Sequence, residues 1–305
     1  MTPAAFRPPQ ADTLLLAALA EDLGLAPESV RGFGPGLLER DVTSSSVLRA
    51  GASFRGRFVA REYLVVCGLP YLERVFALLA EAAGVEGPTL EAAVPEGAFL
   101  EPGETIARIE GDARLVLAGE RTALNLMMTL SGIATEARRW QEEAGESLLV
   151  VDTRKTWPGL RALSKYAVRV GGACNHRMGL WDMVLIKDNH IRAAGGIEEA
   201  VRRAREQHPD LAIQVEADTP EQAERAAASG ADSVLLDNMT DDEVAEATAA
   251  VRRVCEGTGR ECTVEVSGKV ELGRLAALRT LLVDRVSTSA ITFARPVDIA
   301  LDSDE

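Results

Sequence analysis

The chain has 305 residues, which is enough for two domains or for one large α/β domain with an extension. Hydrophobic residues make up 47% and charged residues 26%, as expected of a soluble globular protein. The formal net charge of −14 disfavours both nucleic-acid binding and docking to an anionic membrane, so we expect neither kind of partner. In such an acidic chain, a local cluster of arginine and lysine is informative about function.

Two features of the sequence predict a cytoplasmic protein. The four cysteines form no CxxC pair and are too sparse for a disulfide framework, which indicates reduced thiols. The apolar run 14–20 is short, has no basic leader and continues into Glu21 and Asp22. We therefore predict an amphipathic helix there, and neither a signal peptide nor a membrane span.

The first half of the chain predicts an α+β region. Residues 1–30 are expected to be helical, with Pro8 and Pro9 before the first helix. Residues 50–115 contain short β-rich runs separated by proline and glycine turn signals. Between residues 115 and 142 the apolar residues recur at helical spacing and predict one long helix.

From residue 147 onward, an apolar run, a polar tip and a helical segment recur several times. The apolar runs are 147–151, 183–186, 212–215, 233–236, 262–266 and 285–287. The helical segments are 197–207, 220–229, 241–255 and 271–281. Strands that alternate with helices predict a parallel sheet, and this number of units in such a short chain favours a closed or nearly closed β/α barrel. A doubly wound sheet is the alternative, disfavoured because no GxGxxG follows a strand.

Polar residues stand at the ends of five successive predicted strands. They are Thr153, Arg154 and Lys155, then Lys187, Glu216, Asp237 with Asn238, and Ser267 with Gly268. The carboxyl ends of barrel strands converge on one face, where active sites lie. The cations there are suited to phosphate and carboxylate groups, and the carboxylates to a divalent metal, ribose hydroxyls or a developing cation. One such residue is usually a solvated charge, but five successive strand ends favour a site.

Two further stretches are candidates for the same site. Asn175, His176 and Arg177 follow a Gly-Gly pair, which lets the backbone approach a ligand closely. A lone histidine is more often structural than catalytic, so the prediction of a functional His176 rests on the adjacent Asn175 and Arg177. Arg121 lies in the long predicted helix and, taken alone, is an ordinary surface residue.

Several segments in order along the chain resemble the signature of the quinolinate phosphoribosyltransferases, also called carboxylating nicotinate-nucleotide pyrophosphorylases. The segments are DVT at 41–43, ERTALN at 120–125, SGIAT at 131–135, TRKT at 153–156, PGLR at 158–161, KYAV at 165–168, NHR at 175–177 and LIKDNH at 185–190. The resemblance covers nearly the whole chain. No single segment would be specific, but the ordered set is.

The resemblance implies a fold and an assembly. Members of the family pair an N-terminal α+β sandwich domain with an incomplete, about seven-stranded β/α barrel. They form homodimers or hexamers in which the neighbouring subunit closes the active site. We accordingly expect the sandwich domain over 1–130, the barrel over 131–290 and a C-terminal segment over 291–305, whose last residues are compatible with a return to the sandwich domain.

The resemblance also implies the reaction. Quinolinate and phosphoribosyl pyrophosphate would give nicotinate mononucleotide, pyrophosphate and carbon dioxide with Mg²⁺, in de novo NAD synthesis. Arg154, His176 and Arg177 would hold the two pyridine carboxylates, and Arg121 would enter from the neighbouring subunit.

The remaining site residues follow from the same resemblance. The implied catalytic residues are Lys155, Lys187, Glu216 and Asp237, of which Glu216 and Asp237 would also bind the metal. The implied substrate-binding residues are completed by Thr153, Ser267, Gly268, Ser287 and Ser289, the last four at the 5′-phosphate.

Some positions depart from the family pattern. Ala173 stands where a third glycine is usual, and Trp157 replaces a small residue. Ser289 and Phe293 occupy the places of a glycine and a histidine in the phosphate loop. These departures leave room for a paralogous phosphoribosyltransferase, of the molybdenum-transport-associated type or with another aromatic acid as substrate. An aldolase or lyase with Lys187 as a Schiff-base amine and a non-catalytic binding protein are further alternatives, both disfavoured by the arginine cluster and the carboxylates beside it.

Overall fold

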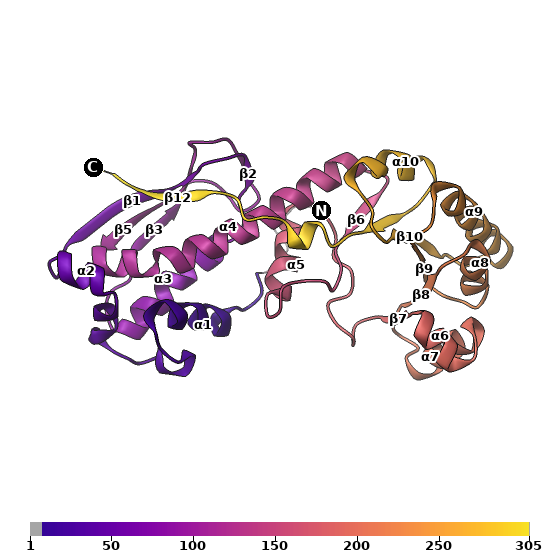
Figure 1. The fold of residues 1–305 in the computed structure, drawn as a ribbon, viewed down its shortest axis with the longest axis horizontal. Helices are drawn as coiled ribbons and strands as arrows, with labels where there is room; N and C mark the ends of the chain where they lie inside the picture. Colours follow the sequence, from indigo (N-terminus) through magenta and orange to yellow (C-terminus); the bar gives the residue numbers. More distant parts are fainter. Residues whose placement is uncertain (1–7, 305) are drawn as a thin grey trace. The chain divides into compact units, whose positions relative to one another are not determined.

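The computed structural model describes residues 8–304, which form two compact units (Figure 1). Within the described residues the first unit comprises 8–136, 157–172 and 293–304, and the second comprises 137–156 and 173–292. These divisions lie close to the expected ones at 130/131 and 290/291. They differ in assigning 157–172 to the first unit, although this stretch lies within the expected barrel segment.

The first unit is built on a four-stranded antiparallel sheet with the order β12-β1-β5-β3. Its strands are β1 (Ser53–Ala60), β3 (Thr89–Ala92), β5 (Thr105–Asp112) and β12 (Ile299–Ser303). Strand β12 pairs with β1, so the end of the chain joins a sheet formed by residues near its beginning. Two short strands, β2 (Leu64–Val65) and β4 (Phe99–Leu100), pair separately.

Two helices of the first unit lie within the segment before residue 30 that is expected to be helical. The helices of this unit include α1 (Asp12–Leu23), η2 (Pro27–Ser29), η3 (Pro35–Arg40), α2 (Val42–Val47), α3 (Leu69–Ala83) and α5 (Arg161–Val170). Residues 1–7 lie outside the described part of the chain, so the expectation of helix is not tested there. Asp41 begins α2 as its N-cap, since its carboxylate accepts from the backbone N–H groups of Thr43 and Ser44.

The long helix α4 (Ala113–Ala144) confirms the helical period seen from residue 115. Two hydroxyl side chains of its SGIAT segment form hydrogen bonds with the backbone of residues 65–67. The Oγ of Ser131 accepts from the backbone N–H of Cys67 at 2.9 Å, and the Oγ1 of Thr135 accepts from that of Val65 at 2.8 Å. Gly132 leaves no room for a side chain, because a Cβ there would overlap the backbone carbonyl oxygen of Arg295.

The second unit is a six-stranded parallel sheet with the order β6-β11-β10-β9-β8-β7. Its strands are β6 (Leu149–Val151), β7 (Val184–Ile186), β8 (Ile213–Ala217), β9 (Ser233–Asp237), β10 (Thr263–Ser267) and β11 (Arg285–Ser287). The helices are α6 (Asp188–Ala194), α7 (Ile197–Gln207), α8 (Pro220–Ala228), α9 (Asp241–Thr258), η4 (Leu272–Arg274) and α10 (Leu275–Thr280), and η5 (Ile291–Phe293) lies where the two units divide. The sheet fits the predicted incomplete β/α barrel, with six strands where about seven were expected. A single bridge between Val151 and Cys174 extends the β6 edge.

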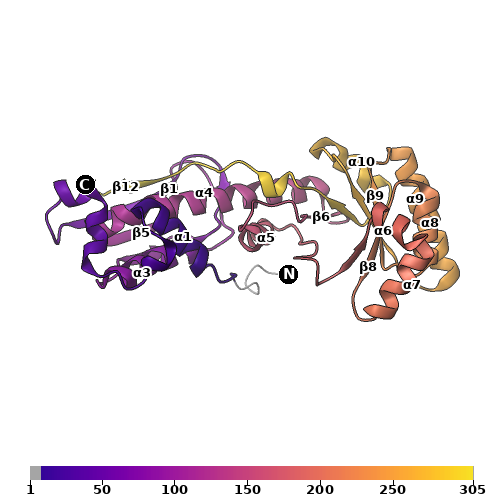
Figure 2. The same cartoon turned by 60° about the horizontal axis from the view of Figure 1, so that its bottom comes forward.

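Strands β7, β8, β9 and β10 are each followed by helices of the same unit. Helices α7, α8 and α9 lie together on the outer face of the sheet (Figure 2), where α8 contacts β8 and β9 and α9 contacts β10. Thr240 starts α9 with a capping box to Glu243, and Thr219 caps α8 ahead of Pro220. Because all six strands run in the same direction, their carboxyl ends meet at one edge of the unit.

The interior of this unit is closely packed and apolar. The central strands bury Val234 and Leu236 of β9 and Val264 and Val266 of β10 at 0% exposure. Burial of one such side chain stabilises the fold by roughly 1.5–3 kcal/mol. None of the helices in the described chain combines the length and the apolar character that crossing a bilayer requires.

Candidate active site

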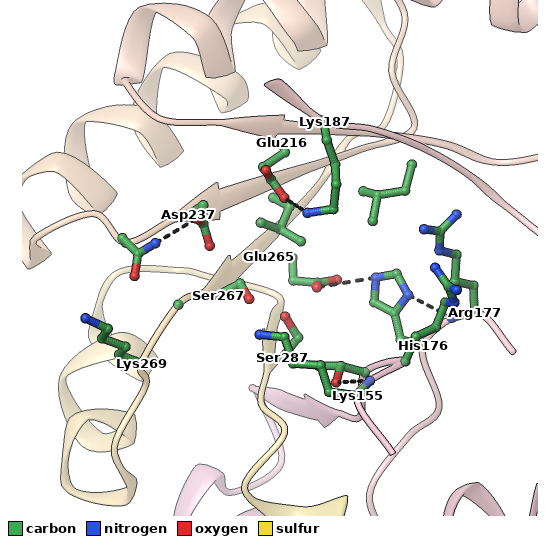
Figure 3. Close-up of a pocket in the computed structure, with 16 residues that line it drawn as sticks. Lys155, His176, Arg177, Lys187, Glu216, Asp237, Glu265, Ser267, Lys269 and Ser287 are labelled. Atoms are coloured by element: carbon green, nitrogen blue, oxygen red, sulfur yellow. Dashed lines mark hydrogen bonds and ion pairs between the residues drawn. The ribbon is translucent and has the colours of Figure 1, made fainter. Parts of the chain in front are cut away.

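A cavity of about 470 Å³ opens at the carboxyl ends of the parallel strands, within the second unit (Figure 3). Its walls combine cations, carboxylates and hydroxyl groups with only two apolar side chains. The lining residues are Thr153, Arg154, Lys155, His176, Arg177, Leu185, Lys187, Glu216, Leu235, Asp237, Asn238, Glu265, Ser267, Gly268, Lys269 and Ser287.

Eleven of the thirteen residues predicted from the sequence line this cavity. They are Thr153, Arg154, Lys155, His176, Arg177, Lys187, Glu216, Asp237, Ser267, Gly268 and Ser287. Ser289 is not among the lining residues, and its backbone carbonyl instead accepts from the Oγ1 of Thr292 at 3.1 Å. Arg121 belongs to the first unit, where its side chain is 69% exposed and lies 3.4 Å from Glu120. Its role at a neighbouring site therefore stays a prediction.

Two guanidinium groups share one side of the cavity. Burial lowers the pKa of Arg177, and the positive charge of Arg154 lowers it further. Arg177 donates from Nη1 to the backbone carbonyl of Met183 at 3.2 Å, which orients the side chain. Two arginines that repel each other in a half-buried site are stabilised when an anion binds between them.

His176 is held at the cavity wall by three hydrogen bonds. Its backbone N–H donates to Asp152 at 2.9 Å, and its Nδ1 accepts from the backbone N–H of Arg177 at 2.7 Å. Its Nε2 lies 2.9 Å from the Oε1 of Gln214. Since Nδ1 accepts, the ring proton is assigned to Nε2, which donates to Gln214.

Behind His176 lies a buried polar network that the sequence analysis missed. Glu265 is 0% exposed and Gln214 is 1% exposed, although both side chains are polar. The Nε2 of Gln214 donates to Glu265 at 3.0 Å and to Ser233 at 3.1 Å. Glu265 also lies 3.5 Å from the Nε2 of His176 (Figure 3). The signal in the sequence is a charged residue between two valines, Val264 and Val266, in an apolar run.

The carboxylates of the cavity lie on neighbouring strands. Glu216, near the end of β8, accepts from the ammonium group of Lys187, which follows β7. Asp237 ends β9 and accepts from the side-chain amide of Asn238 at 2.7 Å. No group of three or more His, Cys, Asp or Glu side chains suited to a metal ion occurs in the described chain. Two carboxylates nevertheless fit Mg²⁺, which is usually bound by one or two carboxylates together with waters and substrate phosphates.

The loops after β9 and β10 form one turn at the rim of the cavity. Gly268 has φ 87°, and a Cβ at this position would lie 2.8 Å from the backbone nitrogen of Asn238. The N–H of Asn238 donates to the carbonyl of Ser267 at 3.1 Å. Only glycine permits this close approach, which leaves the turn open to a ligand.

Taken together, the barrel edge and its ring of arginine, lysine and carboxylate side chains define a β/α-barrel protein suited to small polyanionic substrates. Residues 41–131 match the N-terminal domain of quinolinate phosphoribosyl transferase, and residues 133–302 match its C-terminal domain. The chain belongs to the quinolinate phosphoribosyl transferase family.

Curated relatives and solved structures agree with this assignment. A probable nicotinate-nucleotide pyrophosphorylase [carboxylating] of Synechocystis is 40% identical over 95% of this chain and 91% of its own length. The nicotinate-nucleotide pyrophosphorylase [carboxylating] of Mycobacterium leprae is 39% identical over 86% of this chain and 90% of its own. The crystal structure of NadC from Streptococcus pyogenes superposes with a TM-score of 0.84 at 33% identity, and the match covers 97% of both chains.

Proposed function

We propose that this protein transfers the phosphoribosyl group of phosphoribosyl pyrophosphate to quinolinate and releases carbon dioxide, giving nicotinate mononucleotide and pyrophosphate. The reaction belongs to de novo NAD biosynthesis, and the enzyme is a pentosyltransferase. The names of the curated relatives support this reaction over that of a paralogue with another aromatic acid as substrate.

The observation that carries the proposal is the pairing of Arg154 with Arg177 beside His176. Quinolinate is a planar dicarboxylate, and guanidinium groups bind carboxylates through two parallel hydrogen bonds. The two arginines neutralise the substrate and fix the plane of its ring. Both ring nitrogens of His176 are engaged, Nδ1 with the backbone N–H of Arg177 and Nε2 with Gln214, so His176 positions the backbone of Arg177.

The transfer step requires charge stabilisation and no covalent nucleophile. The pyridine nitrogen forms a bond to C1 of the ribose as the bond from C1 to the pyrophosphate oxygen breaks. Positive charge develops on the ribose, where the carboxylates of Glu216 and Asp237 stabilise it, while Lys155 and Lys187 balance the charge of the leaving pyrophosphate. Preorganised groups of this kind supply a large share of catalysis in many enzymes.

Decarboxylation follows without an organic cofactor. The ribosylated ring nitrogen is positively charged, so it stabilises the electron pair that the breaking carbon–carboxylate bond leaves on C2. A proton then takes the place of the lost carbon dioxide on that carbon. Mg²⁺ carried in with the pyrophosphate, and held by Glu216 and Asp237, would neutralise part of the leaving group's charge.

The pairing of Lys187 with Glu216 disfavours the aldolase alternative. Lys187 donates to the Glu216 carboxylate, so its nitrogen is engaged in an ion pair. A Schiff-base lysine must instead direct its nitrogen at a substrate carbonyl. The same ion pair suits a residue that binds phosphate or carboxylate groups.

We further infer a cytoplasmic homodimer or hexamer in which Arg121 completes the site of the neighbouring subunit. The 70% exposure of both Leu180 and Trp181, two adjacent large apolar residues near the cavity loop, supports association with another subunit. The 69% exposure of the Arg121 side chain is compatible with a role in a neighbouring site.

The proposal is tested by pyrophosphate release from phosphoribosyl pyrophosphate and Mg²⁺, with quinolinate as acceptor and nicotinate as the parallel control. We expect release with quinolinate and little with nicotinate, which lacks the second carboxylate. Arg154→Ala is expected to lower kcat/KM for quinolinate by about a hundredfold or more, on the scale of one lost preorganised charge contact. Equal turnover of the two acceptors would contradict the proposed substrate.

A further inference from the structure

Lysine is rare in this chain, and its positions are not random. Of the 33 basic residues, only four are lysines: Lys155, Lys165, Lys187 and Lys269. Three of them line the cavity, and the fourth, Lys165, is buried at 0% exposure. Every other cation of the chain is an arginine. Since lysine and arginine serve equally well on a solvated surface, the lysines mark places where a compact, flexible point charge is needed.

Lys269 is the cavity lysine to which the proposed reaction assigns no role. It follows Ser267 and Gly268 directly, at the rim of the cavity (Figure 3). Its backbone adopts φ 47°, in the left-handed region that side chains other than glycine rarely occupy. The adjoining turn is fixed by the Asn238 N–H that donates to the carbonyl of Ser267. The chain therefore tolerates an unfavourable backbone conformation in order to place a lysine here.

The charge of Lys269 is not neutralised by a neighbour. No hydrogen bond or ion pair joins its ammonium group to any residue between 8 and 304, although the chain carries a net charge of −14. Lys187, by contrast, is paired with Glu216, and the nearby Asp237 accepts from Asn238. An unpaired ammonium group beside a glycine turn is suited to bind an anion that arrives with the substrate.

We infer that Lys269 binds the 5′-phosphate of the phosphoribosyl group, together with the turn at Ser267 and Gly268. This inference rests on the proposed function, because it needs a substrate that brings a phosphate to this turn. The lysine adds a mobile positive charge to a turn that otherwise offers backbone N–H, hydroxyl and side-chain amide groups. It contributes to the affinity for the donor substrate and for the mononucleotide product, and not to recognition of quinolinate.

The test uses two variants that remove the charge in different ways. Lys269→Met keeps the length of the side chain, whereas Lys269→Gly also relieves the left-handed backbone. Arg253→Ala is the control, since it removes one exposed cation of the same unit outside the cavity. The measurements are KM for phosphoribosyl pyrophosphate at saturating quinolinate, and the Kd of nicotinate mononucleotide by calorimetry.

We expect both Lys269 variants to raise the KM for phosphoribosyl pyrophosphate and the Kd of nicotinate mononucleotide about fivefold to tenfold, as for one charge-assisted hydrogen bond. The KM for quinolinate and kcat should change little, and added salt should weaken the wild type more than the variants. Lys269→Gly should melt no lower than the wild type, which separates weaker binding from a folding defect.

Each other outcome overturns the inference in a distinct way. If the Lys269 variants are active and keep the wild-type KM for phosphoribosyl pyrophosphate and Kd of nicotinate mononucleotide, Lys269 does not bind the 5′-phosphate. The proposed function is then unaffected. A raised KM for phosphoribosyl pyrophosphate with an unchanged Kd of nicotinate mononucleotide would place the contact at the pyrophosphate instead. An equal rise of KM and Kd in Arg253→Ala would show that the effect comes from the net charge of the protein and not from a contact of Lys269. A wild-type enzyme without turnover and without affinity for the mononucleotide would remove the proposed function itself.

Discussion

At the scale of single residues, Glu265 is a carboxylate buried within β10, two residues before Ser267. A buried carboxylate is costly unless its oxygens are hydrogen-bonded or paired with a positive group. Because a carboxylate can only accept, Glu265 obliges the side-chain amide of Gln214 to turn its NH₂ group toward it. The amide oxygen then faces His176, which keeps its proton on Nε2 and leaves Nδ1 to accept from Arg177. Glu265 is thus a positioning residue for the quinolinate side of the site.

The substitution Glu265→Gln tests this chain of hydrogen bonds. A glutamine can donate as well as accept, so it no longer fixes the orientation of Gln214 or the tautomer of His176. We expect kcat/KM for quinolinate to fall about tenfold, as for one lost charge-assisted hydrogen bond. The KM for phosphoribosyl pyrophosphate should change little. Glu261→Gln, an exposed change just before the same strand, is the matched control, and wild-type kinetics in Glu265→Gln would contradict the positioning role.

Glu265 also predicts an acid-sensitive stability. Burial raises the pKa of Glu265, but the neighbouring His176 ring, the positive charge of Arg285 and the Ser287 hydroxyl outweigh it, so the pKa lies below its usual 4.5. A carboxyl with a lower pKa in the folded state stabilises the fold above pH 4.5, and this contribution is lost as the pH falls through the folded-state pKa. Urea unfolding should therefore show the wild type more stable than Glu265→Gln at pH 7, with the difference shrinking below pH 4.5. A difference that stays constant with pH would contradict this assignment.

Residues at strand ends could be predicted from the sequence, but residues inside strands could not. Arg154, Lys187 and Asp237 line the cavity because parallel strands end at a common edge, a rule that needs only the strand positions. Gln214 and Glu265 lie within β8 and β10, before the strand ends. Glu265 lines the cavity itself, and Gln214 is connected to it through a hydrogen bond to Glu265. Such networks depend on which side chains face each other across strands, and register is not visible in one sequence.

At the scale of elements, the turn between β10 and the following loop depends on Gly268. A side chain there would meet the backbone of Asn238, and the positive φ adds strain. We expect Gly268→Ala to displace the turn and to raise the KM for phosphoribosyl pyrophosphate at least tenfold, with a smaller loss of stability. Gly273→Ala is the control, because no atom lies within 4 Å of a Cβ there and its φ is not positive. Equal kinetics of the two variants would show that the turn does not hold the donor substrate.

The predicted strands and helices were largely confirmed, with small errors at their ends. The helix expected at 197–207 matches α7, whereas the strands expected to end at 215, 236 and 266 each extend by one or two residues. Polar residues such as Glu216 therefore belong to the strands, because backbone pairing continues past the apolar run.

Trp157 and Phe293, two departures from the family pattern, pack edge to face at 5.4 Å between ring centroids. That contact joins residues far apart in sequence and was not predictable from their spacing.

At the scale of the whole molecule, the sequence indicated two domains, but the path of the chain between them is less simple than a linear division. Residues 157–172 and the final strand β12 belong to the first unit, although both follow the start of the second. Local periodicity identifies an element and not its partner, so the pairing of β12 with β1 could not be read from the pattern alone.

The proposed sharing of active sites between subunits predicts complementation. Arg121→Ala and Lys187→Ala should each be nearly inactive alone, since one lacks the residue given to the neighbour and the other a residue of its own site. In mixed dimers, one of the two sites regains both residues. Subunits mixed in equal amounts and allowed to exchange should then recover about a quarter of wild-type activity. If the mixture stays inactive while size analysis shows exchanged dimers, Arg121 acts within its own subunit or not at all.

The most direct test of the central claim is the fate of a labelled carboxylate. Quinolinate labelled in the carboxylate at C2 is incubated with the enzyme, phosphoribosyl pyrophosphate and Mg²⁺, and the products are quantified together. We predict labelled carbon dioxide, pyrophosphate and unlabelled nicotinate mononucleotide in equal amounts. A ribosylated product that keeps the label, or no turnover by folded enzyme, would contradict the proposed reaction.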